Sequence, residues 1–311
     1  MSMQARIRSV RYEAEGILSF RLEPMPGAEF PPFTAGAHID VTLGQRLVRS
    51  YSLLNDPAQR NVYEIAVQLD PGSRGGSRLI HAQWRAGQVI EISEPRNHFP
   101  LVEDARHSVL IAGGIGITPM LAMAARLTAL DRSWSMHYAV RTRARAAFLD
   151  RLGAWPAVRL TVDDEPDTPR LDLAALLRDV PANAHVYCCG PAPMLDAFRR
   201  LGAGLGSRLH FEAFSSDAEA AVEGGYVVRL ARSGRSVEVP CGKTMLDALL
   251  DAGVDVPFAC SEGICGTCRI GVLDGTPDHR DQFLSAEEKA ANDSIMVCCS
   301  GARTATITLD L

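Results

Sequence analysis

Four cysteines near the C-terminus constrain this chain more than any other feature of its sequence. Cys260, Cys265 and Cys268 form a C-x4-C-x2-C loop, and Cys298 follows further along the chain. This is the ligand spacing of a plant-type [2Fe-2S] cluster, in which four thiolates bind two irons. Gly263 and Gly266 lie within the loop, where the missing side chain lets backbone amides approach the cluster sulfurs. The spacing therefore predicts an electron carrier.

Two alternatives concern the same cysteines. A structural zinc site usually pairs two short C-x2-C knuckles, and this sequence has one such pair, Cys265 and Cys268. The fourth ligand has two neighbouring candidates, Cys298 and Cys299. In a strand, successive side chains point to opposite faces, so only one of these two thiols can face the cluster.

Composition limits the remaining function classes. The 311 residues are enough for two or three domains, and 47% hydrophobic with 22% charged residues is typical of a globular protein. A net charge of -5 gives no basic field for nucleic acid or an anionic membrane. Residues 108–125 carry no charge, but glycines and Pro119 favour a strand, turn and helix over a membrane span. The polar N-terminus and the cluster cysteines predict a cytoplasmic protein without disulfides.

The sequence pattern predicts three domains. Residues 1–105 alternate apolar and polar positions between Pro and Gly turns, which is typical of short antiparallel strands in a small barrel. Residues 106–222 alternate strands and helices, as in a parallel sheet wrapped by helices. Ser215–Gly225 has the composition of a linker, and residues 223–311 form the cluster module. The expected strands are 108–112, 135–140, 158–162, 185–189 and 209–214, with helices from 119 and at 146–152, 171–178 and 193–201.

Two turns of the parallel-sheet domain are candidates for binding a dinucleotide. The first lies between a strand and a helix, where free amides and the helix N-terminus attract a pyrophosphate. In it, Thr118 is expected to cap the helix and Pro119 to occupy its first position. The second turn opens toward a helix at the carboxyl end of the same sheet, and Cys188 before it is interpreted as a buried apolar residue. The candidate residues are Gly113, Gly114, Gly116, Thr118 and Pro119 in the first turn, and Cys189, Gly190 and Pro191 in the second.

The barrel domain contains two segments that favour a flavin mononucleotide. Arg49 and Tyr51 are expected on one side of a strand and Ser52 on the other. The loop at residues 72–77 combines small donors with one guanidinium, which suits a phosphate; its candidate residues are Arg74, Gly75, Gly76 and Ser77.

These motifs together resemble the phthalate dioxygenase reductase family over nearly the whole chain. The resemblance implies an FMN-binding antiparallel barrel, a parallel-sheet α/β domain that binds NADH, and a C-terminal β-grasp ferredoxin domain with a plant-type [2Fe-2S] cluster. It also implies that the barrel segments hold FMN, that Phe214 lies close to the flavin and that Cys298 is the fourth ligand. The matching runs are Arg-Ser-Tyr-Ser-Leu at 49–53, Arg-Gly-Gly-Ser at 74–77, Gly-Gly-Ile-Gly-Ile-Thr-Pro-Met at 113–120, Cys-Gly-Pro at 189–191, His-Phe-Glu-Ala-Phe at 210–214 and Asp-His-Arg-Asp at 278–281.

One departure from the family pattern follows the fourth ligand. The family usually has Cys-x-Ser-Arg there, whereas this chain has Cys298-Cys299-Ser300-Gly301. The missing arginine is expected to alter the surface that meets a partner, or the hydrogen bonding around the cluster.

The resemblance implies an NADH-dependent oxidoreductase that passes electrons singly through the cluster to a Rieske-type terminal oxygenase, of an aromatic acid dioxygenase or O-demethylase system. No side chain is expected to act as a nucleophile or general base, and His279 is interpreted as a surface or partner contact. The alternatives are a non-catalytic redox sensor and a reductase for another acceptor. A self-sufficient oxygenase would need a Rieske-type His/Cys pair, and the cluster ligands here are all cysteine.

Asp163 leads to a prediction about the dinucleotide. This carboxylate closes the strand at 158–162, where it would bind an adenosine ribose and repel a 2′-phosphate. We expect kcat/KM to be higher for NADH than for NADPH, and equal values would remove this role from Asp163 and its neighbour Asp164.

Overall fold

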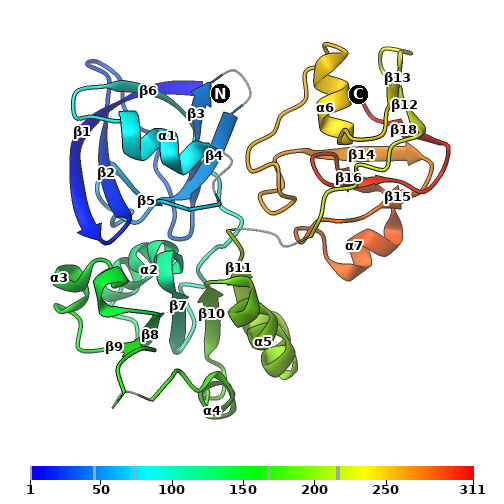
Figure 1. Ribbon diagram of the computed structural model, residues 1–311. Helices are drawn as coiled ribbons and strands as arrows, with labels where there is room; N and C mark the ends of the chain where they lie inside the picture. Colours follow the sequence, from blue (N-terminus) through cyan, green and yellow to red (C-terminus); the bar gives the residue numbers. More distant parts are fainter. Residues whose placement is uncertain (1, 45–46, 73–74, 167–168, 215–217) are drawn as a thin grey trace. The chain divides into compact units, whose positions relative to one another are not determined.

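The computed structural model describes residues 2–44, 47–72, 75–166, 169–214 and 218–311 (Figure 1). The chain divides into two compact units, Met1–Phe214 and Ser215–Leu311. The first unit holds an antiparallel barrel and a five-stranded parallel sheet, and the second holds a smaller mixed sheet. The three predicted architectures are therefore present in the predicted order.

The barrel begins the first unit. Its six strands pair antiparallel in the order β4-β3-β6-β1-β2-β5, and the outer strands β4 and β5 approach each other and close the sheet. Alternate residues of β5, among them Tyr63 and Ile65, point into an apolar core, as expected for half-buried strands. The elements are β1 (Ser2–Ala14), β2 (Ile17–Pro24), β3 (His38–Gly44), β4 (Leu47–Ser52), β5 (Tyr63–Gln68), α1 (Gly76–Gln83) and β6 (Val89–Ser93).

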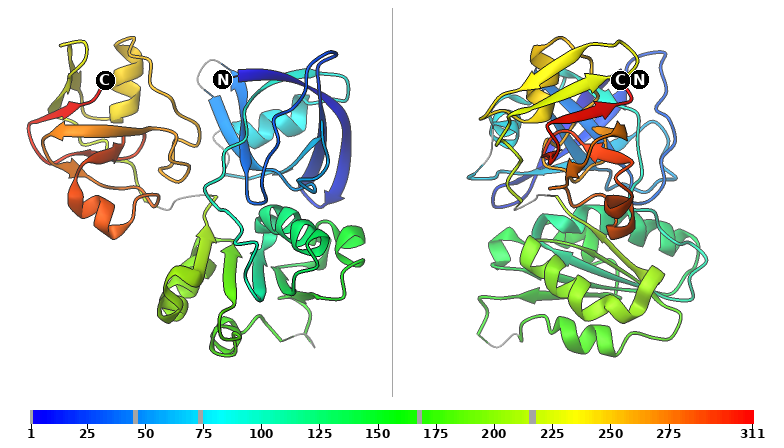
Figure 2. Two further views of the ribbon diagram at one scale, coloured as in Figure 1. Left: turned by 180° about the vertical axis from the view of Figure 1, so that it is seen from behind. Right: turned by 90° about the vertical axis from the view of Figure 1, so that its right-hand side faces the viewer.

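The parallel sheet has the strand order β11-β10-β7-β8-β9. Leu110 and Ala112 of β7 pack with α2, whereas Val109 and Ile111 pack with α4 and α5, so helices cover both faces (Figure 2). The elements are β7 (Ser108–Gly113), α2 (Ile117–Ala129), β8 (Trp134–Val140), α3 (Leu149–Leu152), β9 (Val158–Val162), α4 (Leu173–Arg178), β10 (His185–Cys189), α5 (Ala192–Gly202) and β11 (Leu209–Glu212), with 3-10 turns η1 (Gly114–Gly116), η2 (Arg143–Arg145) and η3 (Ala203–Arg208).

Two helix predictions in this sheet were wrong in detail. Helix α2 begins at Ile117, so Pro119 is not its first residue, and the Thr118 hydroxyl donates a hydrogen bond to the Ile115 carbonyl and does not cap the helix. The predicted helix at 146–152 is reduced to the single turn α3, because Phe148 adopts a left-handed backbone with φ 62°. A left-handed residue cannot continue a right-handed helix.

The second unit is a mixed sheet with the order β13-β12-β18-β14-β16, and helix α6 packs into its apolar core. A hairpin with Gly234 in its turn joins β12 and β13. This arrangement fits the expected β-grasp fold. The elements are β12 (Tyr226–Leu230), β13 (Ser236–Val239), α6 (Met245–Asp251), β14 (Arg269–Asp274), β15 (Pro277–Asp278), α7 (Ala286–Ala291), β16 (Ser294–Met296), β17 (Gly301–Ala302) and β18 (Thr306–Leu309).

Backbone hydrogen bonds attach much of the predicted linker to the second unit. The Ala221 amide donates to the Cys299 carbonyl at 2.8 Å, and the Gly242 amide donates to the Val222 carbonyl at 2.7 Å. Residues 215–217 lie outside the described residues. The free part of the predicted linker at Ser215–Gly225 is therefore shorter than its composition indicated.

None of the helices in the described part of the chain is long and apolar enough to cross a membrane. The uncharged run at 108–125 forms β7, η1 and the first part of α2, as the glycines and proline predicted.

Glu212, the last residue of β11, carries an unusual carboxyl group. Its Oε2 atom is buried and has no hydrogen-bond partner among the described residues, although part of the residue remains exposed. Burial raises the pKa of Glu212 to about 8. In register with it on β10, the Cys189 thiol has its pKa raised by burial and then by Glu212.

The buried carboxyl predicts a pH-dependent stability. The unfolded chain loses the Glu212 proton near pH 4.5, whereas the folded chain keeps it until about pH 8. Stability from this group is therefore complete below pH 4.5 and is lost by up to about 1.4 kcal/mol per pH unit between those values. Glu212→Gln should remove this loss in urea unfolding followed by tryptophan fluorescence, since Trp84, Trp134 and Trp155 all lie in the first unit. Exposed Glu29→Gln is the control, and parallel pH profiles for wild type and Glu212→Gln would contradict the assignment.

Candidate redox site

The cluster cysteines lie together in the second unit. Cys260, Cys265, Cys268 and Cys298 are all buried, between 2% and 8% exposed. Hydrogen bonds from Cys265 and Cys298 lower the pKa of Cys260 to about 2, and a hydrogen bond with Cys298 lowers the pKa of Cys268. These contacts join all four thiols, although they are separated by up to 38 positions in sequence (298 minus 260).

The loop around these thiols suits a cluster better than a single ion. Gly263 and Gly266 have φ of 70° and 74°, and a Cβ on Gly266 would lie 2.3 Å from the Phe283 ring. The Glu262 amide donates to the Cys260 sulfur at 3.3 Å, as backbone amides do around iron-sulfur clusters. The described residues hold no group of three or more His, Cys, Asp or Glu side chains that could bind one metal ion. A two-iron cluster divides its four thiolates between two metal atoms.

The Cys298 and Cys299 thiols have different neighbours, as expected, but strand alternation is not the cause. Both residues follow the end of β16 in a turn, so the expected strand alternation was wrong. The Cys298 thiol contacts Cys260 and Cys268, and also its neighbour Cys299. The Cys299 sulfur lies 2.4 Å from the position that a Cβ on Gly263 would take.

Gly301 has a packing partner at the position where the family usually has arginine. A Cβ on Gly301 would lie 2.9 Å from the Cβ of Ala221, which is itself buried. The segment that leads into the second unit therefore covers this position, and it leaves no room there for a longer side chain without a shift of the backbone.

His279 has a largely buried side chain. Both ring nitrogens are buried without a hydrogen-bond partner among the described residues, and Nδ1 lies 3.7 Å from the Asp281 Oδ1 atom. The Leu284 amide donates to the other Asp281 oxygen at 2.8 Å. His279 is partly buried near the cluster loop, because Asp281 lies against Gly263, and its expected surface or partner-contact role stays a prediction.

The flavin candidates of the barrel converge on one end of α1. A Cβ on Gly76 would lie 2.9 Å from the Arg49 side chain, so the guanidinium stem passes over the first residue of α1. Gly75 precedes this helix with φ 105°, and the Ser77 hydroxyl accepts a hydrogen bond from the Asp70 amide at 3.2 Å. A cation beside a helix N-terminus is a binding site for a phosphate. Arg74 lies outside the described residues.

The neighbouring residues of β4 fit a polar aromatic ligand. The Ser52 hydroxyl is buried and has no hydrogen-bond partner among the residues that the structure describes. Burial raises the pKa of the Tyr51 phenol well above its usual value, while nearby Arg49 lowers it. A buried hydroxyl without a partner is costly unless a ligand satisfies it, so this end of β4 fits FMN.

The two glycine turns of the parallel sheet lie against each other. A Cβ on Gly116 would lie 2.2 Å from the Cys189 carbonyl oxygen, and one on Gly113 would lie 2.7 Å from the Pro191 ring. A Cβ on Gly190 would lie 2.8 Å from the Met194 sulfur and 3.2 Å from the Gly113 Cα. Strands β7 and β10 are adjacent, and the chain leaves them in opposite directions across the sheet. Ligands bind at such a switch point, beyond the carboxyl ends of the strands.

Three further candidate residues are Asp163, Cys189 and Phe214. Asp163 is exposed at the end of β9, two strands from β7, and is tied to β8 by its amide, which donates to the Val140 carbonyl at 2.9 Å. Cys189 is fully buried, with its side chain in the core beneath α2. Phe214 is 38% exposed at the end of the first unit.

Glu212 is a polar residue of this edge that sequence reasoning did not select. It lies in the run His-Phe-Glu-Ala-Phe, within the strand predicted at 209–214. Only its pairing with Cys189 shows that it belongs to the carboxyl edge of the sheet.

Comparisons with known proteins agree with both units. Residues 110–200 match the oxidoreductase NAD-binding domain, and residues 228–303 match the 2Fe-2S iron-sulfur cluster binding domain. The chain is 50% identical over 308 residues to phenoxybenzoate dioxygenase subunit beta of Ectopseudomonas oleovorans, covering 98% of this chain and 96% of that protein. It is 44% identical over 306 residues to tetrachlorobenzoquinone reductase of Sphingobium chlorophenolicum, covering 96% and 94%.

A solved structure of phthalate dioxygenase reductase, described as modular for electron transfer from pyridine nucleotides to [2Fe-2S], has a TM-score of 0.79 and 40% identity. The match covers all of this chain and 98% of that one. The chain is thus an oxidoreductase that uses NADH, FMN and a [2Fe-2S] cluster. It belongs to the phthalate dioxygenase reductase family of oxygenase reductase components.

Proposed function

We propose that this protein reduces the Rieske centre of a terminal oxygenase that acts on an aromatic carboxylate. The observation that carries the proposal is the joining of four buried thiols in a unit separate from the one with the nucleotide turns. Relatives named for dioxygenases of phthalate and phenoxybenzoate support the class of partner. Eight free cysteines are consistent with a reducing compartment, for which we propose the cytoplasm.

The proposed flavin site uses charge at one end and buried polar groups at the other. Arg49 and the N-terminus of α1 at Gly75, Gly76 and Ser77 would hold the phosphate, together with Arg74. Tyr51 and Ser52 would contact the ring system, where the Ser52 hydroxyl would gain a partner. Phe214 would cover the ring from the opposite side, as the family resemblance implies.

The proposed NADH site uses the carboxyl edge of the parallel sheet. Gly113, Gly114 and Gly116 would admit the pyrophosphate to the backbone, with Thr118 and Pro119 opening α2 beneath it. The backbone at Cys189, with Gly190 and Pro191, would line the nicotinamide side, while the Cys189 side chain stays in the core. Asp163 would bind the adenosine ribose. The proposed domain limits remain 1–105 for FMN, 106–222 for NADH and 223–311 for the cluster, although Ala221 and Val222 are hydrogen-bonded within the second unit.

The chemistry of electron pairing belongs to the cofactors. When bound, FMN takes up a hydride from NADH as two electrons and releases them singly to the one-electron cluster. The protein binds and orients the cofactors. Arg49 would neutralise the FMN phosphate, and the glycines would let the NADH pyrophosphate approach the backbone. The iron atoms would be held by Cys260, Cys265, Cys268 and Cys298. No protein group has to exchange a proton with substrate in this scheme.

A second acceptor class has specific support. The relative named tetrachlorobenzoquinone reductase shares 44% identity, so a quinone is the alternative electron acceptor. A redox sensor without turnover is the other alternative, and it predicts that NADH would not bleach the flavin. Anaerobic mixing of NADH, this protein and either a Rieske oxygenase or a quinone separates all three possibilities.

Arg49→Ala tests the flavin site. Loss of a charge-assisted hydrogen bond should weaken FMN by about 1.5–3 kcal/mol, because the phosphate keeps only the α1 N-terminus and loop donors. The purified variant should contain little flavin and normal iron. The control is Arg78→Ala, which removes an arginine of helix α1. Normal FMN affinity in Arg49→Ala would place the phosphate elsewhere.

Cys298→Ser and Cys299→Val test the electron exit. Cys298→Ser should lose the [2Fe-2S] absorbance and paramagnetic signal, and with them NADH-driven reduction of cytochrome c and of the Rieske oxygenase. Reduction of ferricyanide, a small acceptor that can take electrons from flavin, should persist. Cys299→Val should retain all of these activities, because the proposed ligand is Cys298 and Cys299 packs against the loop at Gly263.

The opposite pattern for the two variants would exchange the ligand assignment. Oxygenase reduction at the full rate by a cluster-free Cys298→Ser variant would show that electrons leave by another route.

A further inference from the structure

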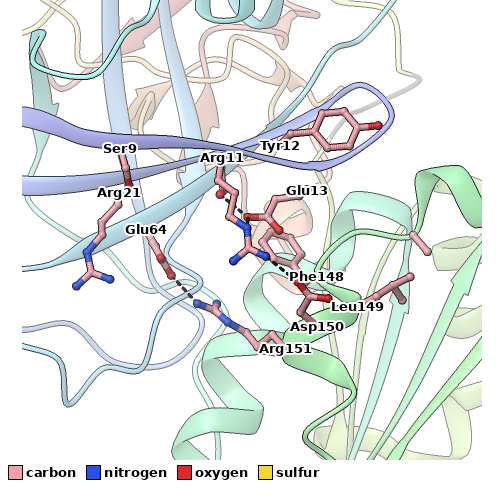
Figure 3. A pocket seen from close by; sticks show the side chains of 12 residues that line it. Ser9, Arg11, Tyr12, Glu13, Arg21, Glu64, Phe148, Leu149, Asp150 and Arg151 are labelled. Atoms are coloured by element: carbon pink, nitrogen blue, oxygen red, sulfur yellow. Dashed lines mark hydrogen bonds and ion pairs between the residues drawn. The ribbon is translucent and has the colours of Figure 1, made fainter.

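A polar cavity of about 300 Å³ lies where the outer face of the barrel meets residues 146–151 of the parallel-sheet domain (Figure 3). Both walls belong to the first unit. Two ion pairs join the walls: Arg151 with Glu64, and Arg11 with Asp150, both at 2.8 Å. The two pairs have the same chemistry but differ in burial and in what they contact.

The Arg151 pair contacts the segment that follows β4, the strand with the flavin candidates. Its Nη2 atom bonds Glu64, which is 17% exposed, and its Nη1 atom donates to the Leu54 carbonyl at 3.3 Å. The Leu54 amide in turn donates to the Glu64 carbonyl at 2.9 Å. Leu54 is two residues beyond Ser52, the last residue of β4 (54 minus 52). One guanidinium therefore ties this segment to α3.

The other side of Arg151 is fixed to the nucleotide edge. Within the same segment, the Ala147 amide donates to the Tyr138 hydroxyl of β8 at 3.2 Å. Phe148 and Tyr138 share one buried cluster with Ile117, the first residue of α2 after the glycine turn. The segment before Arg151 thus belongs to the same close-packed core as the first residue of α2.

Phe148 shows that this segment is held in place. Its left-handed backbone, φ 62° and ψ 25°, is strained for a non-glycine residue. The conformation persists because the ring is only 5% exposed, and the Arg151 guanidinium lies 6.0 Å from its centre. The same turn directs Arg151 toward Glu64, as Figure 3 shows.

We propose that Arg151 and Glu64 are positioning residues, which set the distance between the flavin-binding end of β4 and the nucleotide-binding glycine turn. Hydride transfer needs its two partners in near-contact geometry, and a displacement of about 1 Å can slow such a step about 100-fold. The paired side chains act through the segments they join and touch neither partner. This inference rests on the proposed flavin and NADH sites.

The Arg11–Asp150 pair is the matched control. It crosses the same cavity and involves the residue next to Arg151, but its side chains are 63% and 88% exposed. Exposed pairs of this kind contribute little to stability. Arg11 also lies 3.6 Å from Glu13 of its own strand. In the described structure, neither Arg11 nor Asp150 has a hydrogen bond or ion pair with the segment after Ser52.

The experiment uses the full-length holoprotein with Arg151→Gln, Glu64→Gln and the double variant, against Arg11→Gln and Asp150→Asn. Anaerobic stopped-flow mixing with NADH gives the limiting rate of flavin bleaching and, from its concentration dependence, the Kd of NADH. FMN and iron contents are measured on the same samples. Arg151→Lys, which keeps the charge but loses the planar fork, tests geometry separately from charge.

We expect the Arg151 and Glu64 variants to bleach at least about tenfold more slowly at saturating NADH, with Kd, FMN and iron unchanged. The double variant should be no slower than either single variant, because the pair acts as one unit. Arg151→Lys should recover part of the rate.

Unchanged limiting rates in well-folded Arg151 and Glu64 variants would overturn the proposal and leave the pair a purely structural contact. Equal losses in the Arg11 and Asp150 variants would also overturn it, since any contact across the cavity would then serve. Failure of NADH to bleach the wild-type flavin would instead refute the proposed function.

Discussion

One apolar core runs from the barrel into the parallel sheet of the first unit, and the proposed redox geometry depends on it. Leu54 and Ala66 of the barrel share a buried cluster with Met120 and Tyr138 of the sheet domain. Because protein interiors are close-packed, the two halves cannot slide past each other without opening voids. Apolar contact is non-directional, however, and it leaves the exact relative orientation open. The Arg151 guanidinium adds directional hydrogen bonds from the sheet domain to Leu54 and Glu64 of the barrel domain.

The proposed cofactor sites share a second constraint, which is backbone packing too close for a side chain. A Cβ would meet Arg49 at Gly76, the Cys189 carbonyl at Gly116 and Phe283 at Gly266. In each case the glycine lets a loop lie against a neighbouring segment and leaves amide groups near a place for a phosphate or a sulfur. The glycines thus shape all three sites, although the folds around them differ.

The sequence predicted elements best where the pattern was locally complete. Strands β9 and β10 agree residue for residue with the predicted 158–162 and 185–189, because apolar runs there end at clear turn signals. The predictions failed where backbone geometry overrode the pattern. Phe148 interrupts an expected helix with a left-handed residue, and Cys298 with Cys299 lies in a turn and not in a strand.

The sequence by itself determined the cofactor set, because the cysteine spacing, the glycine turns and the Arg49 strand are local arrangements of neighbouring residues. Only the tertiary structure decided which distant groups meet. Arg151 and Glu64 are 87 positions apart, and Glu212 acquires its raised pKa from burial beside Cys189 on another strand. Spacing fixes what one loop can hold, whereas burial and long-range pairing depend on which segments the fold brings together.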